Sequence, residues 1–388
     1  LDALTDMLCK TFGFHGGNYF SSFEHVRRNY INPDQSHYDW NASRIGLIGE
    51  QIVSHYGVLD YEMRIGGARV RTGGIGGVLT HPHVRKQGVM VQTANAAIDA
   101  MRDAGYDMTV LFGIPDFYHR FGYVRAWNET EHVVWLEDLP EDKPAHRTRK
   151  IKNLRRDDID ALYNEQHATL TGTAVRPTYL RDGDTAPTVQ CWSDGRGRMV
   201  GYVATKLAGN RLVCQEAAGD PEQVLRVLRR TAARHHRREI KLETLPWDHP
   251  LAARVRQGRC EVRQYYQRRG GAMVRTIDLA GCLKKMTAEL RRRLRAGGFE
   301  DWSGTLVIDD GRDKAALEID RGKIAVDEPR RTKHAIRGGD HVAQLLIGTH
   351  EPWETAELGE MKITGDARKL LPALFPIQHP TLSGWDRY

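Results

Sequence analysis

The segment Thr80–Gln92, THPHVRKQGVMVQ, restricts the possible folds of this chain more than any other. The residues before it, YEMRIGGARVRTGGIGGVLT, mix β-type side chains with glycines, which predicts antiparallel strands with bulges. After Gly88 the apolar side chains repeat with a period near 3.6, which predicts an α-helix that stops at Gly105. Such a junction exposes backbone N–H groups at the helix start, and Gly88 permits close approach to them. With the cationic Arg85 and Lys86, the junction predicts a phosphate-binding site.

The order strand, helix, strand occurs a second time, around residues 218–243. There the junction reads GDPEQVL, in which Asp220 is expected to cap the helix and Pro221 to take its first position, with Glu222 beside it. Carboxylates suit the positive end of a helix dipole but repel pyrophosphate. We therefore expect the second copy to serve as a scaffold and pocket wall without a cofactor.

Length and charge set the broad class. A chain of 388 residues exceeds what one hydrophobic core usually organises, so two or three domains are expected. The net charge of +7 favours an anionic partner, and nucleic acid, a membrane surface and a polyphosphate cofactor all qualify. Because no apolar stretch approaches the roughly 20 residues that cross a bilayer, and the start lacks a secretory signal, we expect a cytoplasmic protein. The 5 cysteines are far apart and form no CxxC, which favours reduced thiols over disulfides or a zinc site.

Three further segments indicate how the chain is divided. The residues near 138–152 are charged, include a proline and lack apolar periodicity, which predicts a linker. A third unit opens at Ala280 with a helix whose apolar face is formed by Leu283, Met286, Leu290 and Leu294, and a hairpin follows. The final residues, PTLSGWDRY, are too apolar for a solvated tail, so we expect them to dock.

The segments GGVLTHPHVRKQGVMVQ and LFGIPDFYHRFGYV together resemble the paired signature of the GNAT acetyltransferases. In that signature an Arg-x-x-Gly pyrophosphate turn is followed by a Tyr-containing helix and a Phe-Gly-Tyr strand. The whole chain, including its ending, most resembles the enhanced-intracellular-survival (Eis) family of N-acetyltransferases. One position departs from the pattern, because Met90 stands where the family has a second small residue.

The resemblance implies a mixed α/β architecture of two tandem GNAT domains, each a splayed sheet with helices, and a sterol-carrier-like α+β domain. The expected ranges are 1–140 for the acetyl-CoA-binding domain, 141–278 for the degenerate copy and 279–388 for the third domain. It also implies a homo-oligomer, expected to be a hexamer. The cosubstrate would be acetyl-CoA, with no metal.

The resemblance also assigns residues to the site. The cofactor would contact the splayed strand, the pyrophosphate turn and the end of the next strand: Val78, Leu79, Thr80, Arg85, Lys86, Gln87, Gly88, Val89, Met90, Val91, Gly113 and Ile114. Tyr118 matches the general acid that protonates the leaving sulfur, and the base would be the terminal carboxylate of Tyr388. From the residues alone, packing of an aromatic ring under its helix explains Tyr118 better than an acid role does, and most chain termini fray.

The acceptor is expected to be an amine of a cationic small molecule, such as an aminoglycoside or a polyamine, or of a lysine. Candidate contacts come from the early helices: Phe23, Glu24, Tyr38, Asp39 and Trp40. Arg387 would repel a polycation if it faced the pocket, which counts against aminoglycosides.

Other functions fit parts of the sequence less well. The arginine-rich helices lack aromatic interleaving, so we expect solvated helix faces and no nucleic-acid partner, nor a membrane partner. His81 and His83 have no third metal ligand near them in the sequence. The alternative function is carriage of a lipid or other apolar ligand by residues 279–388, with a vestigial GNAT unit.

Overall fold

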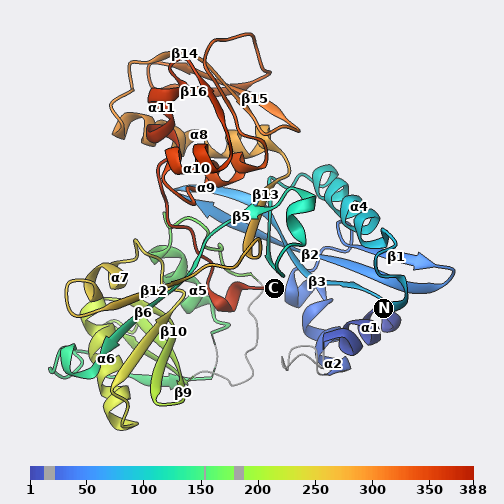
Figure 1. Cartoon of the computed structure of the whole chain (residues 1–388). Coiled ribbons are helices and arrows are strands. Elements are labelled where there is room, and N and C mark those ends of the chain that lie inside the picture. Colours follow the sequence, from blue (N-terminus) through green and yellow to red (C-terminus); the bar gives the residue numbers. More distant parts are fainter. Residues whose placement is uncertain (13–21, 153, 179–187) are drawn as a thin grey trace. The chain divides into compact units, whose positions relative to one another are not determined.

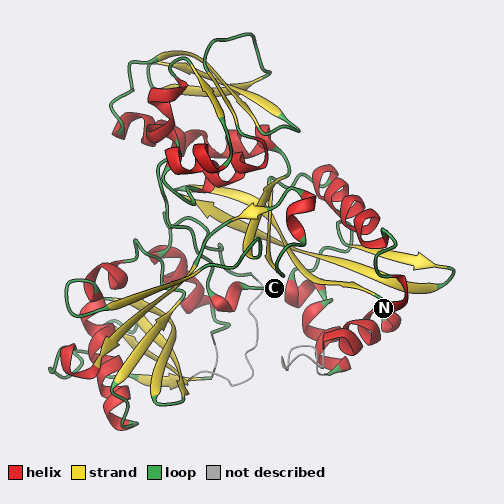
Figure 2. Ribbon diagram, in the orientation of Figure 1, coloured by secondary structure: helices red, strands yellow, loops and turns green. Residues whose placement is uncertain are grey.

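The computed structural model describes residues 1–12, 22–152, 154–178 and 188–388. These residues form two compact units (Figures 1 and 2). The first comprises Leu1–Trp127, Gln267–Pro380 and Tyr388, and the second comprises Asn128–Tyr266 and Thr381–Arg387. Across the described ranges, none of the helices has the length and apolar character needed to span a membrane.

The first unit contains a mixed sheet in the order β1-β2-β3-β4-β13-β5. Its strands are β1 (Arg44–Ile48), β2 (Gln51–Ile65), β3 (Ala68–Thr80), β4 (Met108–Gly113), β13 (Gly271–Thr276) and β5 (Val124–Arg125). Helix α4 (Val89–Asp103) packs on this sheet through Met90, Ala94, Ala97, Ile98 and Met101, all buried. The predicted helix and its two flanking strands are thereby confirmed.

Short helical segments precede this sheet. They are α1 (Asp2–Phe12), α2 (Phe23–His25), the π-helical turn η2 (Val26–Tyr30) and α3 (Pro33–Ser36). Two 3₁₀ turns follow strands of the sheet: η3 (Pro82–Val84) after β3 and η4 (Tyr118–Phe121) after β4. These turns lie at the ends of the strands that the sequence predicts to hold the cofactor.

A second sheet of the same unit has the order β16-β15-β14-β17-β18. Its strands are β14 (Ser303–Asp309), β15 (Lys314–Asp320), β16 (Lys323–Asp327), β17 (Ala335–Arg337) and β18 (Lys362–Thr364). The accompanying helices are α8 (Leu279–Ala296), α9 (Val342–Ile347), α10 (Pro352–Leu358) and α11 (Ala367–Leu374). The four apolar residues predicted to face inward from α8 are all fully buried. The sterol-carrier likeness of this region stays a prediction.

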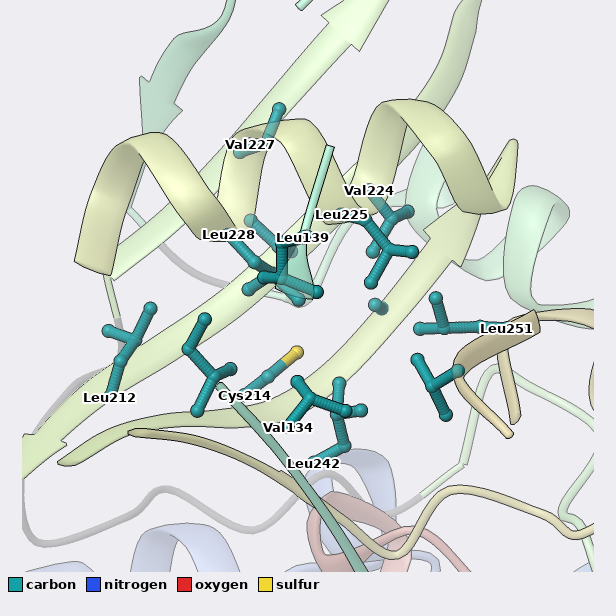
Figure 3. Close-up of a cluster of buried hydrophobic side chains, with 14 of the residues drawn as sticks. Val134, Leu139, Leu212, Cys214, Val224, Leu225, Val227, Leu228, Leu242 and Leu251 are labelled. Atoms are coloured by element: carbon teal, nitrogen blue, oxygen red, sulfur yellow. The ribbon is translucent and has the colours of Figure 1, made fainter. Parts of the chain in front are cut away.

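The second unit contains one sheet in the order β12-β6-β11-β10-β9-β8-β7. Its strands are β6 (Glu129–Trp135), β7 (Arg149–Ile151), β8 (Thr188–Ser193), β9 (Met199–Ala208), β10 (Arg211–Gly219), β11 (Glu239–Glu243) and β12 (Glu261–Tyr265), and its helices are α5 (Asp157–Gln166), α6 (Pro221–Arg234) and α7 (Pro250–Val255). Figure 3 shows the core, where Leu225 and Leu228 of α6 meet Leu242 of β11.

Each of the two large sheets contains one strand from the part of the chain that was expected to form the other domain. Strand β6 lies within the expected domain 1–140 but pairs with β11 and β12 in the sheet of the second unit. Strand β13 lies within the expected domain 141–278 but pairs with β4 and β5 of the first unit. The compact units therefore differ from the boundaries near 140 and 278, because strand pairing between distant segments leaves no mark on local sequence pattern.

Candidate active site

Strands β3 and β4 run parallel and then separate. Their register begins at Thr72 with Met108 and ends at Ile75 with Leu111, although β3 continues to Thr80 and β4 to Gly113. Past Ile75 the backbone groups of β3 no longer pair with β4. The predicted cofactor residues Val78, Leu79 and Thr80 lie on this separated part of β3, and Gly113 lies at the end of β4.

The turn before α4 has the geometry that phosphate binding requires. Lys86 and Gly88 both have positive φ, 64° and 81°, and the helix begins directly after Gly88 without a side-chain cap. The first-turn N–H groups of a helix have no intrahelical acceptor. Arg85, Lys86 and Gly88 are exposed, and a Cβ at Gly88 would meet no atom within 4 Å. The turn therefore presents exposed amides, the positive end of the helix dipole and two cations to a space that is open to an anionic ligand.

A cavity of about 550 Å³ lies beside this turn. Residues from three segments line it, namely Asp6 and Lys10 of α1, the hairpin at Glu50–Ile52, and His81, Pro82 and Arg85. The sequence does not predict this cavity, because nothing in the local pattern brings α1 to the end of β3.

Tyr118 packs against the end of β4. A Cβ at Gly113 would lie 2.5 Å from Cδ2 of Tyr118, so only glycine leaves room for the ring there. The rings of Phe117 and Tyr123 surround it edge-on. Burial, and then the neighbouring Tyr123, raise the pKa of Tyr118 well above its ordinary value of 10.0, so the hydroxyl keeps its proton. Within the described part of the chain this hydroxyl makes no hydrogen bond, and it can donate one.

Tyr388 is docked on β3 rather than frayed. Its ring lies over Gly74, and its hydroxyl donates to the carbonyl of Val110 at 2.9 Å. Two aromatic neighbours, Tyr61 and Phe112, have ring centroids 5.8 and 6.0 Å away. The main-chain carbonyl carbon of Tyr388 lies 3.3 Å from the position that a Cβ would take at Gly76. Because Gly76 follows the last residue of β3 that pairs with β4, this group lies where the strands begin to separate.

Two of the five acceptor candidates have internal polar partners. Tyr38 is buried, and its hydroxyl bonds Nε2 of His55 at 2.7 Å. The carboxylate of Asp39 accepts from the amides of two following residues and from the hydroxyl of Tyr106. The other three, Phe23, Glu24 and Trp40, are exposed. Internal partners therefore account for Tyr38 and Asp39, and a role in acceptor binding stays a prediction for the rest.

The second unit repeats the separated strands but not the phosphate-binding turn. Strands β10 and β11 pair in parallel only as far as Cys214 with Leu242. Asp220 caps α6 by accepting from the amide of Gln223, and Pro221 opens the helix, as predicted. The Asp220 side chain therefore binds one of the first-turn N–H groups of α6, whereas no side chain caps the first turn of α4 after Gly88.

The interior of the second unit is filled by the chain's own ionic groups. Arg176 forms paired hydrogen bonds with Glu216 at 2.8 and 2.7 Å and with Asp386 at 3.0 and 2.9 Å. Ser383 also donates to Glu216. The adjoining cavity is about 20 Å³, close to the volume of one water molecule. The predicted docking of the C-terminal residues is confirmed, and Arg387 is paired with Glu129 at 2.8 Å, which offsets the charge expected to repel a polycation.

Comparison with a family model decides the class of the first domain. The model described as "Acetyltransferase (GNAT) domain" matches residues 2–126. Residues 2–126 form a GNAT acetyltransferase domain. The acyltransferase class that the sequence predicts is thus supported for residues 2–126, the part of the chain that contains the separated strands and the glycine turn.

Solved structures extend the GNAT likeness over most of the chain. A probable N-acyltransferase from Enterococcus faecalis V583 has a TM-score of 0.74 at 16% identity and covers 99% of this chain and 96% of its own. Eis1 from Mycobacterium abscessus has a TM-score of 0.66 at 14% identity, over 90% of this chain and 92% of its own. A GCN5-related N-acetyltransferase from Anabaena variabilis has a TM-score of 0.70 at 15% identity, over 88% and 89%. The fold is thus that of an Eis-like GNAT protein. The sequence matches no curated protein.

No group of three His, Cys, Asp or Glu residues in the described ranges is arranged to hold a metal ion. His81 and His83 lie next to each other, with ring centroids 5.2 Å apart, in the turn that precedes Arg85. The glycines that make room for Tyr388 were not predicted from the sequence. The run GGIGG could have indicated them, since Gly74 and Gly76 lie on one face of β3 and have no side chain to block a docked ring.

Proposed function

We propose that the chain transfers an acetyl group from acetyl-CoA to an amine of a cationic small molecule or of a lysine. The observation that supports the proposal is the position of two groups, one acidic and one phenolic, on the strands that separate. The carboxylate of Tyr388 lies at Gly76 of β3, and the protonated phenol of Tyr118 lies at Gly113 of β4. Acetyl transfer to an amine needs both a group that holds a cationic amine and an acid for the departing thiolate.

The cofactor contacts follow from the open backbone groups. Arg85, Lys86 and the amides from Lys86 to Val91 would hold the pyrophosphate, since this turn combines positive charge with exposed N–H donors. The separated part of β3 would hold the pantetheine arm. Acetyl-CoA supplies an acyl group that is already activated as a thioester.

The protein's own groups then act on the acceptor and the leaving group. The Tyr388 carboxylate attracts the protonated amine and orients it. Because an α-carboxylate has a pKa of about 3.3–3.7, it is a weak base, and we propose that water relays the amine proton past it. The amine nitrogen bonds to the carbonyl carbon as the C–S bond breaks, the amide of Val78 donates to the carbonyl oxygen, and Tyr118 gives its proton to the sulfur.

The experiment that tests this function measures thiol release from acetyl-CoA with aminoglycosides, polyamines and lysine peptides. We expect turnover with one class of amine. Tyr118→Phe should lower kcat about 100-fold and leave the KM for acetyl-CoA nearly unchanged, because only proton donation is lost. Tyr123→Phe is the matched control, since its hydroxyl has internal partners, Tyr56 and Thr109. Equal kcat in Tyr118→Phe and wild type would rule out the acid assigned here.

The glycine turn gives a second prediction. Gly88→Ala places a methyl group in the open space above the turn and forces a side chain into positive φ. We expect the KM for acetyl-CoA to rise about tenfold with little change in kcat, the result of losing uniform binding. Gly105→Ala at the far end of α4 is the control, because its φ is 77° and its Cβ position is equally open. Equal KM values in the two variants would contradict a role for the turn in binding.

The packing of residues 279–388 supports a structural role for this part over lipid carriage. A carrier needs a continuous apolar tunnel, but the apolar faces of α8 and α11 are fully buried against their own unit. The homo-oligomer, the hexamer and the cytoplasmic location stay predictions.

A further inference from the structure

Strand β3 carries a bulge at the point where it leaves β4. On β2, His55 pairs with Leu79 and Gly57 pairs with Gly76, so two residues of β3, Gly77 and Val78, stand opposite one. Gly77 has a φ of 59°. A Cβ there would lie 2.8 Å from the hydroxyl oxygen of Tyr30 and 3.2 Å from Cε1 of His55. Both backbone conformation and space therefore restrict this position to glycine.

A buried histidine holds the carbonyl of the bulge. Nδ1 of His55 lies 2.7 Å from the carbonyl oxygen of Gly77, and Nε2 lies 2.7 Å from the hydroxyl of Tyr38. A carbonyl can only accept, so Nδ1 carries the proton and Nε2 accepts from Tyr38. His55 is fully buried, and burial lowers its pKa to about 4 although the bond to Gly77 opposes this, so the ring is neutral near pH 7.

The orientation of this carbonyl fixes the next amide. In a planar trans peptide the C=O and the following N–H point in opposite directions. The Gly77 carbonyl points to His55, on the side of the sheet where Leu8 and Tyr30 pack. The N–H of Val78 therefore points to the other side, where the Val78 side chain joins the core that contains α4 and Tyr118.

We propose that His55, held by Tyr38, is a positioning residue for acyl transfer. By binding the Gly77 carbonyl it keeps the Val78 N–H directed at the face of β3 where α4 and Tyr118 pack, and there that N–H donates to the thioester carbonyl oxygen. This inference rests on the proposed function. In this proposal His55, on β2, does not touch the cofactor itself. It acts through the Gly77–Val78 peptide, which polarises the thioester carbonyl.

The test uses acetyl-CoA labelled with ¹³C at the thioester carbonyl and difference infrared spectroscopy of the full-length protein. In wild type we expect the carbonyl stretch to move to lower frequency on binding. His55→Leu should lose most of this shift and lower kcat roughly 30-fold or more, while the KM for acetyl-CoA changes less than about threefold, because the loss of an oriented donor acts on the transition state. His55→Asn keeps a donor near the Nδ1 position and should restore much of the shift.

Thr109→Val is the matched control, because it removes a hydrogen bond of the same 2.7 Å length to another β3 carbonyl, that of Gly73. It should leave the carbonyl frequency unchanged. Tyr38→Phe, which keeps His55 and changes the fold least, should give a smaller loss of the shift.

The outcomes separate the two proposals. Failure of wild type to bind labelled acetyl-CoA would overturn the proposed function. Binding with an unshifted carbonyl in wild type, or an equal shift in wild type and His55→Leu, would leave the proposed function standing and overturn the role of His55.

Discussion

Extension of the chain by two residues beyond Tyr388 is expected to lower kcat about 100- to 1000-fold while acetyl-CoA binds as before. The extension converts the terminal carboxylate at Gly76 into a neutral amide and moves the new carboxylate away from the separated strands. The cofactor contacts lie on other residues, so its dissociation constant, measured by isothermal titration calorimetry, should change less than about threefold.

Two further variants separate the carboxylate from the ring. Tyr388→Ala keeps a terminal carboxylate but removes the ring over Gly74 and the hydrogen bond to Val110. It should retain more activity than the extended chain, since the charge remains in place but is less firmly held. Deletion of Tyr388 removes the ring and moves the terminal carboxylate back to Arg387, away from Gly76, so it should match the extended chain. An extended chain with wild-type kcat would rule out the carboxylate as a functional group.

Replacement of Arg176 by methionine is expected to lower the free energy of unfolding of the second unit by about 3–5 kcal/mol. The Arg176 side chain has no exposed surface, and it faces Glu216 and Asp386, whose side chains are 5% and 0% exposed. The substitution removes the guanidinium that lies over the ring of Tyr163 and leaves two carboxylates without a counter-charge. Urea unfolding followed by tryptophan fluorescence gives the measurement, since Trp192 and Trp385 lie in this unit.

Asp386→Asn is the control for this loss. Burial raises the pKa of Asp386 to about 6, with Arg176 opposing the rise only in part. A neutral amide at this position should therefore be tolerated at pH 7. If Asp386→Asn lowered the free energy of unfolding as much as Arg176→Met, the negative charge of Asp386 itself would be required for the stability of this cluster.

The same carboxyl sets a pH dependence with a defined sign. Its pKa is raised on folding, so the folded chain binds its proton more tightly than the unfolded chain between pH about 4 and about 6. This contribution to stability is complete below pH about 4 and is lost as the pH rises through about 6. Relative to Asp386→Asn, wild type should gain stability from pH 7.5 to pH 5.

The features that sequence predicted correctly are those that local geometry determines. The apolar repeat placed α4, and the acidic residue before Pro221 identified the cap of α6, because both depend on residues within one or two helical turns. The glycine turn at Gly88 was predicted for the same reason. The start of a helix can be predicted from the few residues around it.

The features that sequence missed depend on contacts between distant segments. Gly74 and Gly76 indicated a bulged strand, but not that they make room for the terminal residue. Nothing in the sequence indicated His55, because the role proposed for it depends on the bulge in the neighbouring strand β3 and on the hydroxyl of Tyr38. Tyr38 and Asp39 were expected at the acceptor and instead have internal partners, since an aromatic or acidic residue in an early helix fits either environment.

The exchange of β6 and β13 has a consequence during synthesis of the chain. As the polypeptide leaves the ribosome, β4 emerges without β13, which follows only after the whole second unit has been made. Until then the edge of β4 exposes unpaired backbone groups, the kind of edge that recruits other strands. A fragment ending near residue 140 would keep that exposed edge permanently and would carry β6 without its sheet. The sheet of the first unit is therefore continuous in space but cannot be obtained by cutting the gene at a single point.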